Sequence, residues 1–236
     1  MTQHTTLFLL PHAGGASFSY APFRRCFPQT LDVRPVDLSG HGTRLSEPLL
    51  DTIPAMAADI LAHHLSTVPD PYILFGHSMG ATLAYEVCCQ ALIAGLPLPA
   101  QLIVSGRQGP AIVETRRRSM LPSKEFRAHL KNLGGISDEV LAQPELMDMF
   151  EPIIRADFAA IETYVPSSST LLPIPVLVLA GRDDEVTDDE LMAWQQITTV
   201  PITIQRFPGG HFYLFEHAQQ VADIVINAIA LTKGKN

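Results

Sequence analysis

A serine flanked by glycines is the pattern in this sequence that predicts chemistry most directly. Residues 76–80 read Gly-His-Ser-Met-Gly, follow an apolar run that ends at Phe75, and precede a helical pattern that begins at Ala81. Such a serine on a tight strand-to-helix turn is a nucleophile elbow. The flanking glycines are needed there because any Cβ would collide with the neighbouring strand and helix. The pattern therefore predicts that Ser78 is the nucleophile of a hydrolase.

A serine nucleophile needs a general base that is itself oriented by a carboxylate. Asp183, Asp184 and Glu185 follow one later apolar run, and His211 follows the last one. Loops that follow parallel strands emerge at the same edge of the sheet, so these groups should converge on Ser78. The order serine, acid, histidine is that of α/β-hydrolases. Spacing alone leaves the choice among the three acids open.

His211 competes with eight other histidines for the role of general base. His217 is the nearest in sequence, but it falls within a helical pattern, and His63 and His64 fit one face of another helix. We therefore predict His211 as the base.

The oxyanion that forms during acyl transfer needs two N–H donors. The first is the backbone N–H after the nucleophile, here that of Met79. The second is expected from the loop after an early strand, where residues 11–15 read Pro-His-Ala-Gly-Gly. We predict the N–H of Ala13 as this donor. The alternative is that Gly14 and Gly15 only form a tight turn.

The elements that must position these residues alternate along the chain. Short apolar runs rich in Leu, Ile and Val lack polar alternation, which indicates parallel strands buried on both faces. We expect six strands, at 7–11, 31–36, 72–76, 102–106, 176–181 and 202–207. Candidate crossover helices are 53–66, which starts after the capping residue Thr52, and 79–94, 188–197 and 217–231. This alternation predicts an α/β fold with a mostly parallel central sheet and flanking helices.

Residues 107–170 interrupt the alternation. Helical patterns run over 123–133, 137–142 and 144–164, without a convincing strand. Turn-rich stretches of Gly, Pro and Ser flank the segment on both sides. We therefore expect one domain, 1–236, with a helical lid insertion at 107–170.

Composition excludes several classes of protein. The 236 residues carry 16 Lys and Arg against 24 Asp and Glu, a formal net charge of −8, so we expect no binding to nucleic acid. The N-terminus lacks a signal-peptide core, and no apolar run approaches the roughly 20 residues that span a bilayer, so no membrane association is expected. The three cysteines, Cys26, Cys88 and Cys89, suit neither a disulfide framework nor a metal site. A reducing cytoplasm fits this composition.

Several motifs together resemble the stand-alone type II thioesterases, α/β-hydrolases that accompany non-ribosomal peptide synthetases and polyketide synthases. Beside the elbow, the resemblance rests on residues spread over nearly the whole chain: 10–15, 40–44 (Gly-His-Gly-Thr-Arg) with Glu47 and Pro48, 133–135, 144–146, 155–157 (Arg-Ala-Asp) with Glu162 and Tyr164, and 210–212. The segment around Arg155 and Asp157 is more specific to this family than the elbow, which many hydrolases share.

The resemblance implies the fold, the substrate and the acid. An α/β-hydrolase with a helical lid would hydrolyse acyl or aminoacyl thioesters on the phosphopantetheine arm of carrier proteins, as a monomer and without cofactor or metal. The family's Gly-x-x-Asp motif maps onto Asp184, and Arg155 and Asp157 are expected to brace the lid against the core. Where this chain has Ser39, His41 and Glu185, the family often has Pro, Arg and Pro.

A run of basic residues gives a candidate surface for an acidic carrier protein: Arg116, Arg117, Arg118, Lys124, Arg127 and Lys131. The alternative is an ordinary solvated helix face.

Two other functions share parts of this pattern. A general carboxylesterase would have the same catalytic residues and a different pocket. A non-catalytic binding module usually lacks part of the triad, whereas every part is present here.

Macrocyclising thioesterases normally sit at the end of a synthetase, and this chain begins close to its first strand, so hydrolysis is expected.

Overall fold

A computed structural model describes residues 5–67, 71–136, 138–141 and 143–233 of the chain. Six strands form one sheet, in the order β2-β1-β3-β4-β5-β6, and every neighbouring pair is parallel. Their bounds are β1 Thr6–Leu10, β2 Asp32–Pro35, β3 Tyr72–His77, β4 Gln101–Ser105, β5 Val176–Gly181 and β6 Thr203–Phe207. The prediction of six parallel strands is confirmed, with ends that differ by at most one residue.

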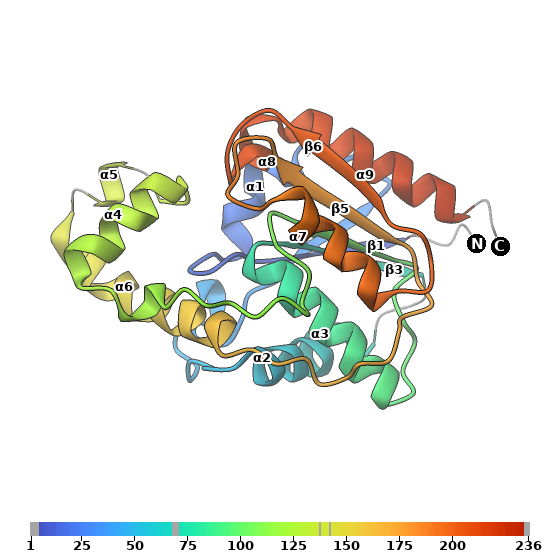
Figure 1. Cartoon of the computed structure of the whole chain (residues 1–236), viewed down its shortest axis with the longest axis horizontal. Coiled ribbons are helices and arrows are strands. Elements are labelled where there is room, and N and C mark those ends of the chain that lie inside the picture. The colour runs from blue at the N-terminus through green and yellow to red at the C-terminus, as the bar shows by residue number, and fades with distance from the viewer. Residues whose placement is uncertain (1–4, 68–70, 137, 142, 234–236) are drawn as a thin grey trace.

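Helices cover both faces of the sheet (Figure 1). On one face lie α2 (Ile53–Ile60), α3 (Met79–Ile93) and α7 (Asp188–Met192), and on the other lie α1 (Ala21–Arg24), α8 (Tyr213–Glu216) and α9 (Ala218–Lys233). Each face encloses its own hydrophobic cluster, and alternate side chains of β1 divide between them, Phe8 and Leu10 on one side and Leu7 and Leu9 on the other. Strands buried on both faces explain the continuous apolar runs in the sequence.

The segment between β4 and β5 carries helices in its middle part, which projects to one side of the sheet (Figure 1). It contains α4 (Ser123–Leu133), α5 (Asp138–Leu141) and α6 (Pro144–Glu162), and no strand among its described residues. These helices enclose a small cluster of their own, formed by Phe126, Leu130, Met147 and Ile154. The predicted helix at 123–133 is confirmed, and the predicted ends 137 and 142 of the next helix lie outside the described residues.

Three predicted helices differ in detail from the observed ones. The pattern at 53–66 forms α2 and continues as a π-helical turn, Leu61–Leu65. The pattern at 188–197 forms α7 followed by a 3-10 turn, Ala193–Ile197. His217 was predicted to be helical, but its backbone (φ −116°, ψ 35°) separates α8 from α9. In the described part of the chain, no helix is both long and apolar enough to cross a membrane.

Candidate active site

The turn between β3 and α3 has the geometry of a nucleophile elbow. Ser78 has φ 56° and ψ −116°, and it is the only described non-glycine residue with positive φ. A Cβ on Gly76 would lie 1.9 Å from the carbonyl oxygen of Gly80, and a Cβ on Gly80 would lie 2.2 Å from that of Leu10. Side chains cannot occupy these positions because the obstacles are backbone atoms. This tight packing holds Ser78 in a strained conformation, and Ser78 lines the cavity at this edge of the sheet.

The acid and the histidine meet at the same edge of the sheet. Nδ1 of His211 lies 3.0 Å from Oδ2 of Asp184, and both side chains are largely buried. Asp183 is exposed, and Glu185 turns to two arginines instead. Within the described part of the chain, Asp184 is the one of the three candidate acids that contacts His211.

The loops after β5 and β6 hold this pair through their backbones. Arg182 N–H donates to Phe207 O at 2.8 Å, and Asp183 N–H donates to Gly209 O at 3.0 Å. Gly181 permits the approach, since its Cβ would lie 2.2 Å from Gly210 O. The backbone contacts between the loop after β5 and the loop after β6 therefore fix the distance between Asp184 and His211.

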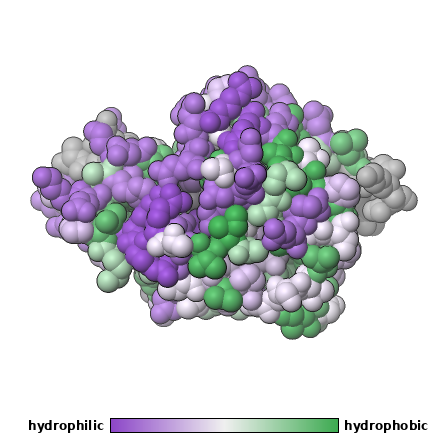
Figure 2. Space-filling model, viewed as in Figure 1, coloured by the Kyte–Doolittle hydropathy of each residue, from purple (hydrophilic) through white to green (hydrophobic). Residues whose placement is uncertain are grey.

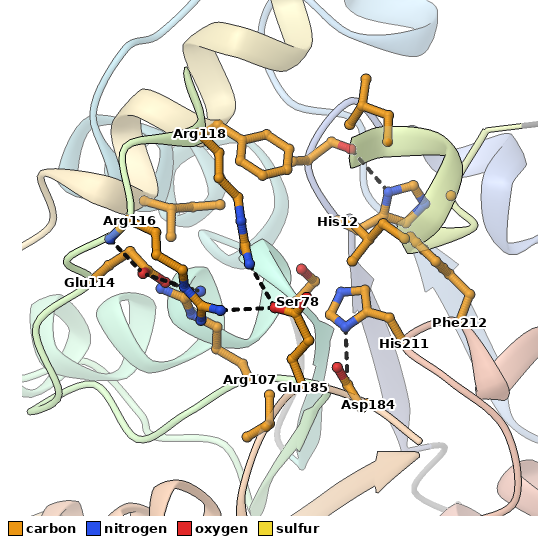
Figure 3. Close-up of a pocket in the computed structure, with 18 of the residues that line it drawn as sticks. His12, Ser78, Arg107, Glu114, Arg116, Arg118, Asp184, Glu185, His211 and Phe212 are labelled. Carbon is orange, nitrogen blue, oxygen red and sulfur yellow. Dashed lines mark hydrogen bonds and ion pairs between the residues drawn. The ribbon is translucent and has the colours of Figure 1, made fainter. Parts of the chain in front are cut away.

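Ser78, Asp184 and His211 line one cavity, as expected for residues at the carboxyl ends of β3, β5 and β6 (Figure 3). Nε2 of His211 is buried and has no hydrogen-bond partner among the described residues. With Nδ1 occupied by Asp184, Nε2 is the nitrogen left to accept a proton from a hydroxyl.

Ala13 lines this cavity from the loop after β1, whereas Met79 is fully buried at the first position of α3. The loop is a tight turn, in which Gly15 N–H donates to His12 O at 2.8 Å and Gly14 has φ +70°. A tight turn was the alternative to an oxyanion loop, and the two are compatible.

Two further histidines lie around His211: the His77 ring packs against it, and His12 packs against the neighbouring Phe212 and lines the cavity. Burial lowers the pKa of His12 to about 4, and it holds the pKa of His77 well below the usual range. Gly106, at φ +61°, leaves room for the imidazoles, since its Cβ would lie 2.8 Å from the His77 ring and 3.3 Å from that of His211. Both neighbours are neutral at pH 7, so His211 sits among uncharged rings. His77 lies inside the elbow motif, but nothing in its spacing indicates that its ring packs against His211.

The cavity has two unlike walls and a volume of about 80 Å³. One wall is apolar and comes mainly from the helical segment: Leu130, Leu133, Ile136, Ile154, Phe158, Ile161 and Phe212. The other is charged and carries Arg107, Glu114, Arg116, Arg118 and Glu185 (Figure 3).

The charged wall is internally paired. Oε2 of Glu185 lies 2.8 Å from Arg116 and 2.6 Å from Arg118, and Glu114 lies 3.2 Å from Arg116 and 3.5 Å from Arg107. Burial lowers the pKa of Arg107, and the Glu114 carboxylate opposes this shift. The ion pairs with Glu185 join the start of the helical segment to the loop that carries Asp184.

The comparison with known protein families identifies this arrangement. A family model described as "Thioesterase domain" matches residues 5–229. The chain is a member of the thioesterase domain family. It is therefore a hydrolase of thioesters on an α/β-hydrolase fold, as the sequence analysis expected.

Individual relatives span nearly the whole of this thioesterase. It is 30% identical over 235 residues to thioesterase PikA5 of Streptomyces venezuelae, covering 97% of this chain and 82% of that protein. The crystal structure of ClbQ from the colibactin pathway superposes with a TM-score of 0.91 at 30% identity, covering 99% of this chain and all of the other. The type II thioesterase BorB from the borrelidin cluster gives a TM-score of 0.86 at 36% identity, covering 96% and 93%.

The basic run of this thioesterase is largely occupied by internal contacts. Arg116 and Arg118 pair with Glu185, Arg117 donates to the backbone carbonyls of Glu114 and Glu162, and Arg127 pairs with Glu151 and Asp148. These contacts favour a structural role for the four arginines over a free docking surface.

The Arg-Ala-Asp segment of α6 contributes in two different ways. Asp157 reaches the core, where its Oδ2 accepts from Gly14 N–H at 2.7 Å and lies 3.0 Å from Nε2 of His41. Arg155 instead contacts Glu151 and the carbonyl of Ser119, within the helical segment. The expectation of a brace to the core is therefore confirmed for Asp157 and wrong for Arg155.

Within the described ranges, no group of three or more His, Cys, Asp or Glu side chains is arranged to hold a metal ion.

Proposed function

We propose that this thioesterase uses Ser78, His211 and Asp184 as a catalytic triad on acyl or aminoacyl thioesters. The observation that carries the proposal is that an elbow serine at positive φ shares one cavity with a histidine paired to a buried aspartate. His211 takes the hydroxyl proton as Ser78 attacks the thioester carbonyl, and Asp184 stabilises the resulting imidazolium. The thiol leaves, and water then cleaves the acyl-enzyme with the same base.

The backbone N–H groups of Ala13 and Met79 form the oxyanion hole in this proposal. Ala13 lines the cavity, and Met79 is the first residue of α3, where backbone N–H groups have no partner within the helix and the helix dipole favours negative charge. A thiol with a pKa near the ordinary value of about 8.5 departs with little help from a general acid. Stabilisation of the oxyanion is thus the larger demand on the site.

The substrate is carried on the phosphopantetheine arm of a carrier protein in this proposal. Support comes from the relatives, among them ClbQ from a peptide synthetase and polyketide synthase pathway and BorB from a biosynthetic cluster. The role would be the removal of wrong or stalled acyl groups from carriers.

Residues 107–170 act as a lid in the same proposal. They supply most of the apolar wall over Ser78, and the ion pairs of Arg116 and Arg118 with Glu185 tie the start of the segment to the rim. A thin pantetheine arm would enter between this segment and the sheet, where mobile segments commonly control access.

Hydrolysis of loaded carriers tests the proposal. Acetyl-loaded and aminoacyl-loaded carrier protein are incubated with the wild type, Ser78→Ala and, as a control, the exposed Ser66→Ala. Mass spectrometry of the carrier should show loss of the acyl group with the wild type and the control, and none with Ser78→Ala.

Two other outcomes would overturn different parts of the proposal. Cleavage of small esters with loaded carriers left intact would exclude the carrier substrate and favour a general carboxylesterase. Equal activity of Ser78→Ala and the wild type would exclude Ser78 as the nucleophile.

A further inference from the structure

A buried contact joins three parts of the molecule behind the active site. Oδ2 of Asp157, in α6, accepts from Gly14 N–H at 2.7 Å and lies 3.0 Å from Nε2 of His41. His41 belongs to the loop after β2, and Gly14 to the loop after β1. The side chain of Asp157 is fully buried and that of His41 is 3% exposed. One carboxylate oxygen therefore links the helical segment to both core loops, out of contact with solvent.

The partners of His41 define its protonation. Nδ1 lies 3.1 Å from the carbonyl oxygen of Ser39, which can only accept, so this nitrogen carries a proton. Nε2 faces Oδ2 of Asp157, and a proton must lie between these two atoms because two lone pairs would otherwise meet at 3.0 Å. The pair therefore holds one proton more than a neutral imidazole beside a carboxylate.

The electrostatic surroundings favour this extra proton. Burial by itself would lower the pKa of His41, but the hydrogen bond to Asp157 and its charge, the Ser39 carbonyl and the charge of Asp37 together raise that pKa. Burial also opposes ionisation of Asp37, yet hydrogen bonds from Thr43 and Ser17 lower its pKa. His12, beyond Asp157, has a pKa of about 4 and stays neutral.

The loop after β1, residues 11–15, is called the oxyanion loop here because it carries Ala13. Its position depends on the contact of Asp157 with Gly14 and His41. Gly14 directly follows Ala13, and its N–H is held by Asp157. Gly14 also packs under α6, since a Cβ there would lie 2.6 Å from Cγ1 of Ile154. A neutral His41 can satisfy either Ser39 or Asp157 but not both, so loss of the proton breaks one buried contact. Asp157 then loses part of its support, and α6 and the adjacent Ala13 are held less firmly.

We propose that the proton shared by His41 and Asp157 positions the oxyanion loop, which makes His41 a positioning residue for turnover. The inference rests on the proposed oxyanion role of Ala13. The two acceptor atoms that face His41 require a proton on each ring nitrogen, so the loop is held below the raised pKa of His41 and released as pH rises through that pKa. The proton leaves to solvent. Activity should therefore decline on the alkaline side, because His41 loses the proton that it shares with Asp157.

The pH dependence of kcat for an acetyl-pantetheine thioester tests the proposal. His41→Arg keeps a positive charge at all accessible pH values, so its profile should lack the alkaline decline of the wild type. His41→Gln has no charge and should lower kcat about tenfold at neutral pH with little change in KM, because an oxyanion contact forms only in the transition state. An alkaline decline that is the same in His41→Arg and the wild type would overturn the proposal, as would a wild-type kcat in His41→Gln.

His63→Arg is the matched control. His63 also pairs with an aspartate, Asp59, at 2.9 Å, but its side chain is 58% exposed and lies on the π-helical turn after α2. Its replacement should leave the alkaline decline unchanged.

A direct measurement separates this proposal from the catalytic assignment and covers the case in which His41→Arg does not fold. Nitrogen NMR of imidazole-labelled Ser78→Ala protein, with His41 assigned through His41→Gln, should show both ring nitrogens of His41 protonated at pH 7. In Asp157→Asn, His41 should lose that proton at lower pH. A single-tautomer neutral His41 at pH 7 would overturn the proposal, whatever the enzyme's activity.

Discussion

At the scale of single residues, the acid of the proposed triad is decided by contact. Asp183 and Asp184 are neighbours of the same type; their spacing does not separate them, and only the family resemblance favoured Asp184. The Asp184 side chain is 3% exposed and pairs with His211, whereas Asp183 is exposed and engages the next loop only through its backbone N–H. The exchange of a carboxylate for an amide should therefore affect the two positions very differently.

Asp184→Asn should lower kcat by about 10³-fold or more, because the amide neither holds the right tautomer of His211 nor stabilises its imidazolium; the equivalent change in a serine-protease triad costs roughly 10⁴-fold. Asp183→Asn should stay within about twofold of the wild type. The measurement is steady-state hydrolysis of a short acyl thioester, with thermal melting to verify folding. A larger loss in Asp183→Asn than in Asp184→Asn would reverse the assignment.

At the scale of elements, one buried carboxylate fixes the chain after α6 to α3. Glu86 of α3 is fully buried and accepts from Tyr164 OH at 2.7 Å, from Ser167 N–H at 3.2 Å, and from the Ser167 hydroxyl. Burial and the charge of Glu86 raise the pKa of Tyr164, so this phenol stays a donor. The chain that follows the helical segment is thus anchored to α3, whereas the start of the segment is tied by the more exposed ion pairs of Glu185.

Glu86→Ala should lower the free energy of unfolding by about 3 kcal/mol, since it removes the buried carboxylate that accepts hydrogen bonds from Tyr164, Ser167 and Gln90. For a chain of this size the loss corresponds to a fall in Tm of roughly 6–12 °C. Glu125→Ala, at an exposed site in α4, is the control and should change stability by about 0.5 kcal/mol or less. Equal melting temperatures of Glu86→Ala and the control would show that Glu86 is no anchor.

At the scale of the whole molecule, charge and surface character determine how a partner could approach. The protein carries a formal net charge of −8, and four arginines of its basic run are engaged in internal contacts. Hydrophilic residues dominate the part of the surface over α4–α6 in Figure 2, and apolar residues elsewhere on that face occur in small groups. This face therefore has no broad apolar area for a partner, and the overall field repels an acidic protein.

For an acidic carrier protein, KM should fall modestly, by less than about threefold, when ionic strength rises from about 0.05 M to about 0.5 M. Salt screens the repulsion between two proteins of like net charge. The measurement is the rate of deacylation of a loaded carrier, with acetyl-pantetheine as the small-molecule reference. A KM that rises several-fold with salt would instead indicate docking through the basic run, and Arg116→Ala and Arg118→Ala would then locate it.

Much of this organisation could be predicted from the sequence because it depends on local patterns. Continuous apolar runs indicate buried parallel strands, and the Gly-x-Ser-x-Gly stretch between strand and helix indicates the elbow around Ser78. The position of His211 after the last strand follows from the rule that such loops share one edge of the sheet. The helical spacing of apolar residues within 107–170, with turn residues on both sides, likewise predicts the helices of this segment.

Tertiary structure alone decided which distant groups touch. Sequence position could not show that Asp184 rather than Asp183 faces His211, that Arg116 and Arg118 turn to Glu185, or that Asp157 links Gly14 with His41. Local patterns record which face of an element is buried, but not which side chains of separate elements meet there. Those contacts depend on the packing of α6 and the loops against one another, and hydrogen bonds of 2.7–3.0 Å require that packing to be complete.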